Sequence, residues 1–163
     1  MADVQTYIST PQGDIESGRV KGGLPDRAFR DAWKLEGQVV SLDVALMKPI
    51  ASARVKAWRD AQISAPIEVG GVTYAADEKS IDLVDRATQL AGRMEKAGQT
   101  FETEWSDVNG NGVPMGSDEI NALGIAIGVR TGQMHVLARQ KVQAIEAATS
   151  ADEIVAILAE IDA

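Results

Sequence analysis

The chain has 163 residues, of which 45% are apolar and only 4% aromatic, and it contains no cysteine. This aliphatic composition favours packed helices, and the lack of cysteine excludes disulfides, thiol catalysis and thiolate metal sites. The net charge of −8 arises in residues 64–163, which carry seven basic and sixteen acidic side chains, and we expect no nucleic-acid partner because such binding needs clustered Lys and Arg.

The amino-terminal segment, residues 1–25, contains four glycines, two prolines and only scattered large apolar side chains. It shows no basic region followed by an apolar core, so we expect no signal peptide. Because the segment buries too little apolar surface to fold alone, we expect an extended arm. Fixing each backbone residue costs roughly 1–2 kcal/mol, so such an arm becomes ordered only on something that holds it.

Residues 26–66 form a second expected segment, a hairpin followed by a basic helix that is a candidate docking surface. Ala32–Leu35 and Val39–Leu42 are short apolar runs that flank a turn. The helix begins either at Asp43, with a kink at Pro49, or at Pro49 itself. Its expected apolar stripe is Ile50, Ala53, Ala57 and Ala61, and its expected basic flank is Arg54, Lys56 and Arg59.

Residues 67–163 form the third expected segment, in which a helix, a hairpin and a second helix follow one another. A small hairpin around Gly70-Gly71 comes first. Asp77 is a suitable N-cap for a helix that runs to about Ala97, with Gly98 as its end signal. The expected buried stripe of this helix is Ile81, Val84, Ala87, Leu90 or Ala91, and Met94.

The best-marked unit is Thr100–Leu123. Its first residues alternate between apolar and polar, which predicts a half-buried strand, and a turn rich in Asp, Asn and Gly follows. Ser117 is the expected N-cap of a long helix that ends near Ala148. A capping box that starts at Ser150 predicts a separate last helix. The expected stripe of the long helix is Ile120, Leu123, Ile127, Met134, Ala138 or Val142, and Ile145.

Three glycines recur at a spacing of four within the long helix, at Gly124, Gly128 and Gly132. Each costs about 1 kcal/mol in helix propensity relative to alanine, so close backbone approach is the expected reason for them. One interpretation is packing against the small residues Ala87, Ala91 and Gly92. The other is a subunit interface between identical helices.

Asp107–Gly112 matches the first half of a calcium-binding loop, D-x-N-x-N-G, with Asp118 at the twelfth position. A strand precedes the loop where a calcium site of this type has a helix, the twelfth ligand is Asp rather than Glu, and Pro114 stiffens the segment. We therefore favour a hairpin turn and expect no metal site, while the calcium interpretation stays open.

No motif in the sequence is typical of catalysis. His135 is the only histidine and has no second ligand or base at a recognisable spacing. Asp82 and Asp85 lie one helical turn apart, as expected for a solvated face. No nucleophile elbow, phosphate-binding loop or dinucleotide fingerprint occurs. We expect neither an enzyme nor a cofactor. The longest apolar run, Ala122–Val129, is too short to span a bilayer, and we expect no membrane partner.

From about Ala53 to Ile157 the chain resembles a bacteriophage domain family of uncharacterised function that occurs in tail-fibre and tail-fibre-assembly proteins. The matching features are the basic helix RVKAWRDAQI, Asp77 with Ser80 after a short hairpin, the Trp105 hairpin, and the helix segments GSDEINAL and ARQKVQAIEAA. The turn DVNGNG is longer than is usual in the family. The segment FRDAWKLEGQVVSLD separately resembles segments that recur in phage proteins.

This resemblance implies a non-enzymatic structural protein of the phage tail or tail-fibre attachment region. Its expected partners are tail or tail-fibre proteins and further copies of itself in a symmetric homo-oligomer, and its expected location is the virion. The alternatives are a tail-fibre assembly chaperone in the host cytoplasm, absent from the mature particle, or a head or connector accessory protein. An enzyme or a calcium-dependent binding module is the remaining hypothesis. The expected fold class is mainly α with short β-hairpins, as a helical hairpin or small bundle with an extended amino-terminal arm.

Overall fold

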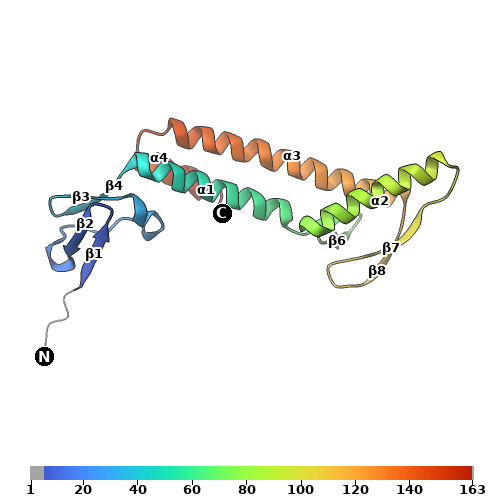
Figure 1. Cartoon of the computed structure of the whole chain (residues 1–163), viewed down its shortest axis with the longest axis horizontal. Helices are drawn as coiled ribbons and strands as arrows, with labels where there is room; N and C mark the ends of the chain where they lie inside the picture. Colours follow the sequence, from blue (N-terminus) through green and yellow to red (C-terminus); the bar gives the residue numbers. More distant parts are fainter. Residues whose placement is uncertain (1–5, 163) are drawn as a thin grey trace, which may run out of the picture. The chain divides into compact units, whose positions relative to one another are not determined.

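Helices and short antiparallel hairpins make up the part of the chain that the structure, a computed structural model, describes, namely residues 6–162 (Figure 1). The expected class, mainly α with short β-hairpins, is confirmed. In chain order the elements are β1 (Tyr7–Thr10), β2 (Gly13–Glu16), β3 (Trp33–Glu36), β4 (Val39–Leu42), α1 (Val44–Ser64), β5 (Ile67–Val69), β6 (Val72–Tyr74), α2 (Glu78–Lys96), β7 (Glu102–Ser106), β8 (Gly112–Gly116), α3 (Ser117–Ala147) and α4 (Ala151–Ala159), with short 3₁₀ turns at Ser17–Arg19 and Arg27–Ala32.

The described residues divide into two compact units, each with its own buried side chains. One unit consists of residues 6–56 together with 139–162, and the other of residues 57–138. The helices α1 and α3 contribute residues to both units. The three segments expected from the sequence, 1–25, 26–66 and 67–163, divide the chain at other points.

The amino-terminal segment differs from the extended arm expected for it. β1 and β2 pair antiparallel, with Ile8 opposite Ile15, and Gly13 takes a φ of +131° at the turn. The backbone N–H of Lys21 donates to the carbonyl oxygen of Gln38 at 2.7 Å. β1 also contacts β3 (Figure 1). The segment therefore obtains its order from backbone pairing and from contacts with its own chain, while residues 1–5 of the expected arm lie outside the described part.

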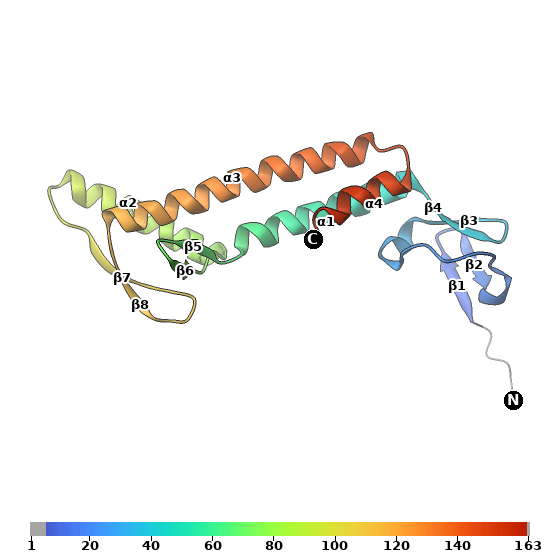
Figure 2. The ribbon, with the colours of Figure 1, turned by 180° about the vertical axis from the view of Figure 1, so that it is seen from behind.

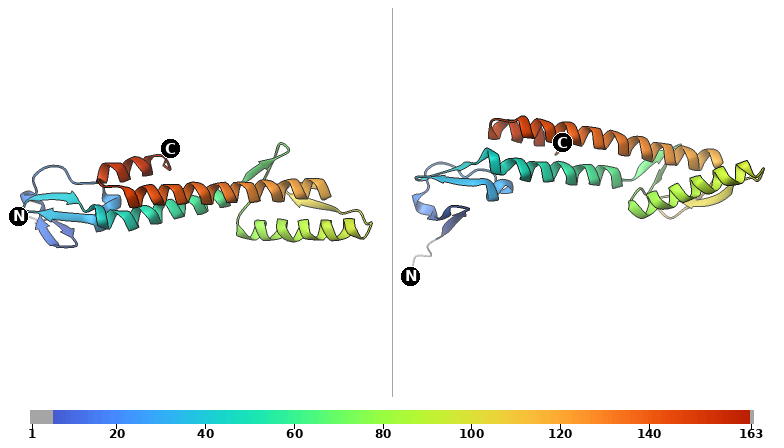
Figure 3. Two further views of the ribbon diagram at one scale, coloured as in Figure 1. Left: turned by 90° about the horizontal axis from the view of Figure 1, so that it is seen from above. Right: turned by 45° about the horizontal axis from the view of Figure 1, so that its top comes forward.

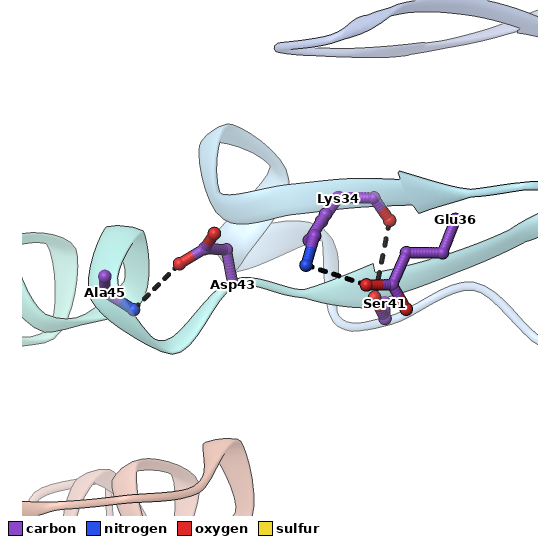
Figure 4. A network of polar contacts seen from close by, with 5 residues as sticks. All are labelled: Lys34, Glu36, Ser41, Asp43 and Ala45. Atoms are coloured by element: carbon purple, nitrogen blue, oxygen red, sulfur yellow. Dashed lines mark hydrogen bonds and ion pairs between the residues drawn. The ribbon is translucent and has the colours of Figure 1, made fainter.

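The hairpin of β3 and β4 is confirmed, and it leads directly into α1 (Figure 4). The ammonium of Lys34 pairs with the carboxylate of Glu36 at 2.7 Å, and the hydroxyl of Ser41 donates to the carbonyl oxygen of Lys34. The carboxylate of Asp43 then accepts the N–H of Ala45 at 2.9 Å. Of the two expected helix starts, the earlier is correct, because this cap satisfies N–H groups of the first turn and Pro49 lies inside α1.

The expected apolar stripe of α1 was wrong. Ala53, Ala57 and Ala61 are exposed, and the buried row is Met47, Ala51 and Val55. Because α1 begins at Val44 rather than at Pro49, Met47 lies on the helix and extends a row of i, i+4 positions. Burying methionine and valine removes more apolar area from water than burying alanines, so this row faces the core.

In the unit of residues 57–138, the stripes expected for α2 and for the first half of α3 are confirmed. Val84 and Ala91 of α2 are buried with Ile120, Leu123 and Ile127 of α3. Where the sequence left a choice between Leu90 and Ala91, Ala91 is buried and Leu90 is 49% exposed. Tyr74 of β6, Phe101 directly before β7, and Met115 of β8 also belong to this core. Figure 2 shows the hairpins β5–β6 and β7–β8.

The caps of α2 lie where they were expected. The Asp77 carboxylate accepts the N–H of Ser80 at 3.0 Å. This bond, together with the bond from the Ser80 hydroxyl, favours the ionised form and lowers the pKa of Asp77. At the other end Gly98 takes a φ of +69°, and the N–H of Gln99 donates to the carbonyl oxygen of Met94 at 2.8 Å, as in a Schellman motif.

The start of α3 differs by one residue from the expected cap. Ser117 is the first helical residue, and the Glu119 carboxylate accepts the N–H of Gly116 at 2.9 Å. This is the glutamate half of a capping box, so Gly116 rather than Ser117 occupies the cap position. At the end of the chain, the Ser150 hydroxyl accepts the N–H of Glu153 at 3.3 Å and begins α4 as expected.

The unit of residues 6–56 and 139–162 joins the start of α1 to the end of α3 and to α4. The ammonium of Lys48 donates to the carbonyl oxygen of Glu146 at 2.7 Å. The Arg54 guanidinium pairs with Asp162 at 2.9 Å and lies 5.8 Å from the centre of the buried Phe29 ring. The hydrogen-bond acceptors of Lys48 and Arg54 therefore lie 98 and 108 positions later in the chain.

Candidate functional site

The turn between β7 and β8 is closed by the side chain of Asp107. One carboxylate oxygen accepts the N–H groups of Asn109 and Asn111, both at 2.8 Å, and the other accepts the side-chain amide of Asn111 at 2.9 Å. Gly110 takes a φ of +83°. Both carboxylate oxygens are thus engaged inside the turn, and the strands pair directly on either side of it, from Ser106 to Gly112. This geometry supports the hairpin-turn interpretation.

The same hydrogen bonds set the ionisation of Asp107. The Asn111 amide, followed by the Asn111 and Asn109 N–H groups, favours the carboxylate and lowers the pKa of Asp107. Because its pKa in the folded state is below that in the unfolded state, the stability it contributes is present above the unfolded pKa. That contribution is lost as the pH falls through the lowered pKa.

The turn also lies against β6. The N–H of Val108 donates to the carbonyl oxygen of Thr73 at 3.0 Å. The adjacent Tyr74 is buried, and this burial, with the negative charge of Asp107 as a second cause, raises the pKa of the Tyr74 phenol. The turn is therefore fixed by the hydrogen bonds to the Asp107 carboxylate and by the backbone hydrogen bond to β6.

We predict that calcium at millimolar excess leaves the melting temperature of the protein unchanged. The physical reason is that a ligand which binds only the folded state must raise its stability, and the Asp107 oxygens already accept hydrogen bonds within the turn. Differential scanning calorimetry with and without calcium, using magnesium as the matched control, measures this. A rise of several degrees that Asp107→Ala abolished would contradict the hairpin-turn interpretation.

The other polar candidates lie apart from this turn. His135 is exposed on α3, and Asp82 and Asp85 line a groove between α2 and α3. The Asp85 carboxylate accepts the side-chain amide of Gln89 at 2.7 Å. Over the described range 6–162, no group of three or more His, Asp or Glu side chains is placed to hold a metal ion.

The three glycines of α3 have different surroundings. A Cβ at Gly124 would lie 3.1 Å from the hydroxyl oxygen of Thr88 and 3.6 Å from a methyl group of Val84, so α2 packs closely here. At Gly128 and Gly132 a Cβ would meet nothing within 4 Å. Packing against α2 thus explains Gly124, although through Val84 and Thr88 rather than through the small residues expected. It does not explain the other two.

The exposed side of α3 carries a second row of small and apolar residues, which we call the outer α3 face: Ala122, Ile125, Val129, Gly132 and Val136. These residues recur at alternating spacings of three and four, so they share one side of the helix. Ile125 is 66% exposed and Val129 53%. Figure 3 shows this part of α3 beside α2. This face is absent from the sequence-based expectations, which follow only the buried stripe, although apolar residues on both sides of a helix are a readable signal.

The outer α3 face carries no charge. Arg130 is the one Lys, Arg, Asp or Glu residue between Ala122 and Ala138. Its guanidinium donates to the carbonyl oxygens of Ile63, at 2.7 Å, and Pro66, at 3.2 Å. Burial lowers the pKa of this guanidinium. Arg130 is therefore occupied at the end of α1 and lies off the outer α3 face.

No helix within residues 6–162 is long and apolar enough to cross a membrane. A family described as "Domain of unknown function (DUF4376)" matches residues 46–161, from the first turn of α1 to just beyond α4. No curated protein and no solved structure matches the chain. Because the matched range covers more than half of the chain, the chain belongs to the DUF4376 family.

Proposed function

We propose that the chain is a non-enzymatic structural protein of a bacteriophage tail or tail-fibre attachment region, and that it works there as a symmetric oligomer. The phage setting rests on the resemblance of the basic helix, the Trp105 hairpin and the GSDEINAL helix start to tail-fibre and tail-fibre-assembly proteins. The proposed partners are tail or tail-fibre proteins and further copies of the chain. The proposed location is the virion.

The observation that carries the proposal is the outer α3 face, an apolar surface that the described residues leave exposed. Ile125 and Val129 of this face are 66% and 53% exposed, and Val136 is 43% exposed. Soluble monomers seldom leave large contiguous apolar patches in water, and such patches usually mark surfaces that bind other proteins. Surfaces of this kind suit a protein that acts by association.

Mass spectrometry of purified particles tests the proposal. We expect the chain to be present in particles of a phage that encodes it, at a copy number in a simple ratio to the other tail proteins. The control is a lysate protein of similar abundance that is not part of the particle, which should be depleted by purification.

Absence from the particles, together with co-purification with a fibre protein before assembly, would replace this proposal with the chaperone hypothesis. If the chain is neither present in particles nor co-purified with a fibre protein before assembly, an assembly role is contradicted. Hydrolysis of peptidoglycan or polysaccharide by the purified chain, lost when one Asp or Glu is replaced, would contradict the non-enzymatic part of the proposal.

A further inference from the structure

We propose that the outer α3 face binds the same face of a second copy of this chain, with the two α3 helices antiparallel. The inference rests on the proposed function, since it names the contact by which two copies associate. It concerns only α3 residues of the unit 57–138.

The first argument is charge. Residues 64–163 carry seven basic and sixteen acidic side chains, so two copies repel each other over much of this surface. The outer α3 face is the exception on α3, because it is uncharged from Ala122 to Val136 and Arg130 is bound to the end of α1. The acidic side chains beside it are Asp82 and Asp85 of α2, in the groove that Ile125 also lines. A strongly charged partner would leave its charges facing apolar side chains, which is costly. An uncharged apolar helix face avoids both the repulsion and the burial of a charge. The outer α3 face of a second copy is such a face.

The second argument is shape. Ile125, Val129 and Val136 project from the face as exposed side chains, whereas Gly128 and Gly132 leave gaps beside them with no neighbour within 4 Å. In an antiparallel pair related by a twofold axis near Thr131, Val129 lies opposite Gly132 of the second copy, and Ile125 lies opposite Val136 of the second copy. A face that carries both the projections and the matching gaps is self-complementary, as a twofold interface requires.

The acidic start of α3 selects the antiparallel orientation. Asp118 precedes Ile125 by seven residues, two helical turns, and therefore lies on the same side of α3. A parallel pair would place two Asp118 carboxylates opposite each other, whereas an antiparallel pair separates them and also opposes the two helix dipoles.

The length of the face sets the expected strength of association. From Ala122 to Val136 it extends about 21 Å along the helix. This is short for a stable interface, which buries about 800 Å² on each partner. We therefore expect a dimer that dissociates on dilution rather than a permanent one.

Sedimentation of the full chain over a range of concentrations tests the proposal. We expect the mass to rise from monomer to dimer, and we expect Ile125→Asp to weaken the dimer at least about tenfold, because each introduced carboxylate is buried without a partner against Val136 of the other copy. Leu83→Asp is the matched control, since Leu83 is an exposed leucine on α2 of the same unit. It should dimerise like the unaltered chain.

A chain that stays monomeric at all concentrations would overturn the proposal. So would an Ile125→Asp variant that dimerises as tightly as the unaltered chain, or a Leu83→Asp variant that is equally weakened. Circular dichroism of each variant shows whether its helices are intact, and the crosslinking experiment below does not depend on either aspartate substitution.

Crosslinking tests the orientation of the two α3 helices. Because the natural chain has no cysteine, each variant carries a single reactive thiol at the chosen position. A short bismaleimide should link a mixture of Ile125→Cys and Val136→Cys chains several times faster than either chain with itself. Faster self-linking of Ile125→Cys would overturn the antiparallel pair. Neither result depends on the particle experiment. A chain that dimerises but is absent from particles would contradict the proposed function and leave this interface standing. A chain that is present in particles but monomeric in solution would contradict this interface and leave the location in the particle standing.

Discussion

Replacing Leu123 by alanine should lower the free energy of unfolding by about 2–5 kcal/mol. Leu123 is 0% exposed and belongs to the core that α3 forms with Val84 of α2, with Phe101, which directly precedes β7, and with Met115 of β8. The loss combines the transfer of the leucine side chain with the cavity left behind, because side chains from a helix and a hairpin cannot all move in to fill the space. Urea denaturation followed by circular dichroism measures the change.

The matched control for this prediction is Leu90→Ala, the same replacement on α2 at a side chain that is 49% exposed. A surface substitution of this kind usually changes stability by less than about 0.5 kcal/mol. Equal losses at the two positions would mean that the core does not lie where α2 and α3 meet. The urea dependence of the free energy should stay the same in both variants, because the surface exposed on unfolding is nearly unchanged.

Replacing Phe29 by alanine should lower the free energy of unfolding by about 3–5 kcal/mol. The ring is 1% exposed and lies 5.8 Å below the Arg54 guanidinium. Leu158 of α4 and Asp162 line the same groove as Phe29 and Arg54. The substitution therefore removes the buried ring and also the contact that positions the Arg54 side chain beside Asp162. Thermal denaturation measures the loss, and hydrogen exchange locates it.

Faster exchange should appear in residues 44–56 of α1 and in α4, since both contribute to this unit. Val39→Ala is the control, because Val39 is 47% exposed on β4 of the same unit and its replacement should change little. If Phe29→Ala melted like the unaltered chain, the 3₁₀ turn at Arg27–Ala32 would have no part in holding the unit together.

The hairpins and caps could be predicted because their causes are local. Gly70 and Gly71 take φ values of +61° and +80°, a conformation that other residues rarely adopt, so this glycine pair alone indicates the turn between β5 and β6. Asp77 and Gly98 likewise satisfy backbone groups within a few residues of themselves. A short stretch of sequence holds all the information that such features need.

The errors concern features whose partners lie far along the chain. The buried row of α1 depends on what covers it, and alanines at i, i+4 spacing are no guide when larger side chains occupy a neighbouring row. The amino-terminal segment has few apolar residues, yet Lys21 finds its backbone partner at Gln38 and β1 contacts β3. Periodicity within the segment cannot show either contact.

The candidate sites divide in the same way. The Asp107 turn was favoured from its residue types and its flanking strands, both of which are local signals. The outer α3 face was only partly visible, because the glycine spacing drew attention to α3 without showing which glycines α2 would cover. A Cβ at Gly124 would lie against Thr88 and Val84 of α2, from 36 and 40 positions earlier in the chain, and this separates Gly124 from Gly128 and Gly132.

The bonds from Arg130 to the end of α1 have a consequence for the order of folding. The carbonyls of Ile63 and Pro66 receive their donors from a residue 67 and 64 positions later in the chain. Contacts between distant residues form slowly, because the entropy of closing a long loop must be overcome before they contribute. The hairpin β5–β6 and helix α2 can therefore form early from local contacts, whereas the last turn of α1 gains these donors only once residue 130 has been synthesised and α3 has docked.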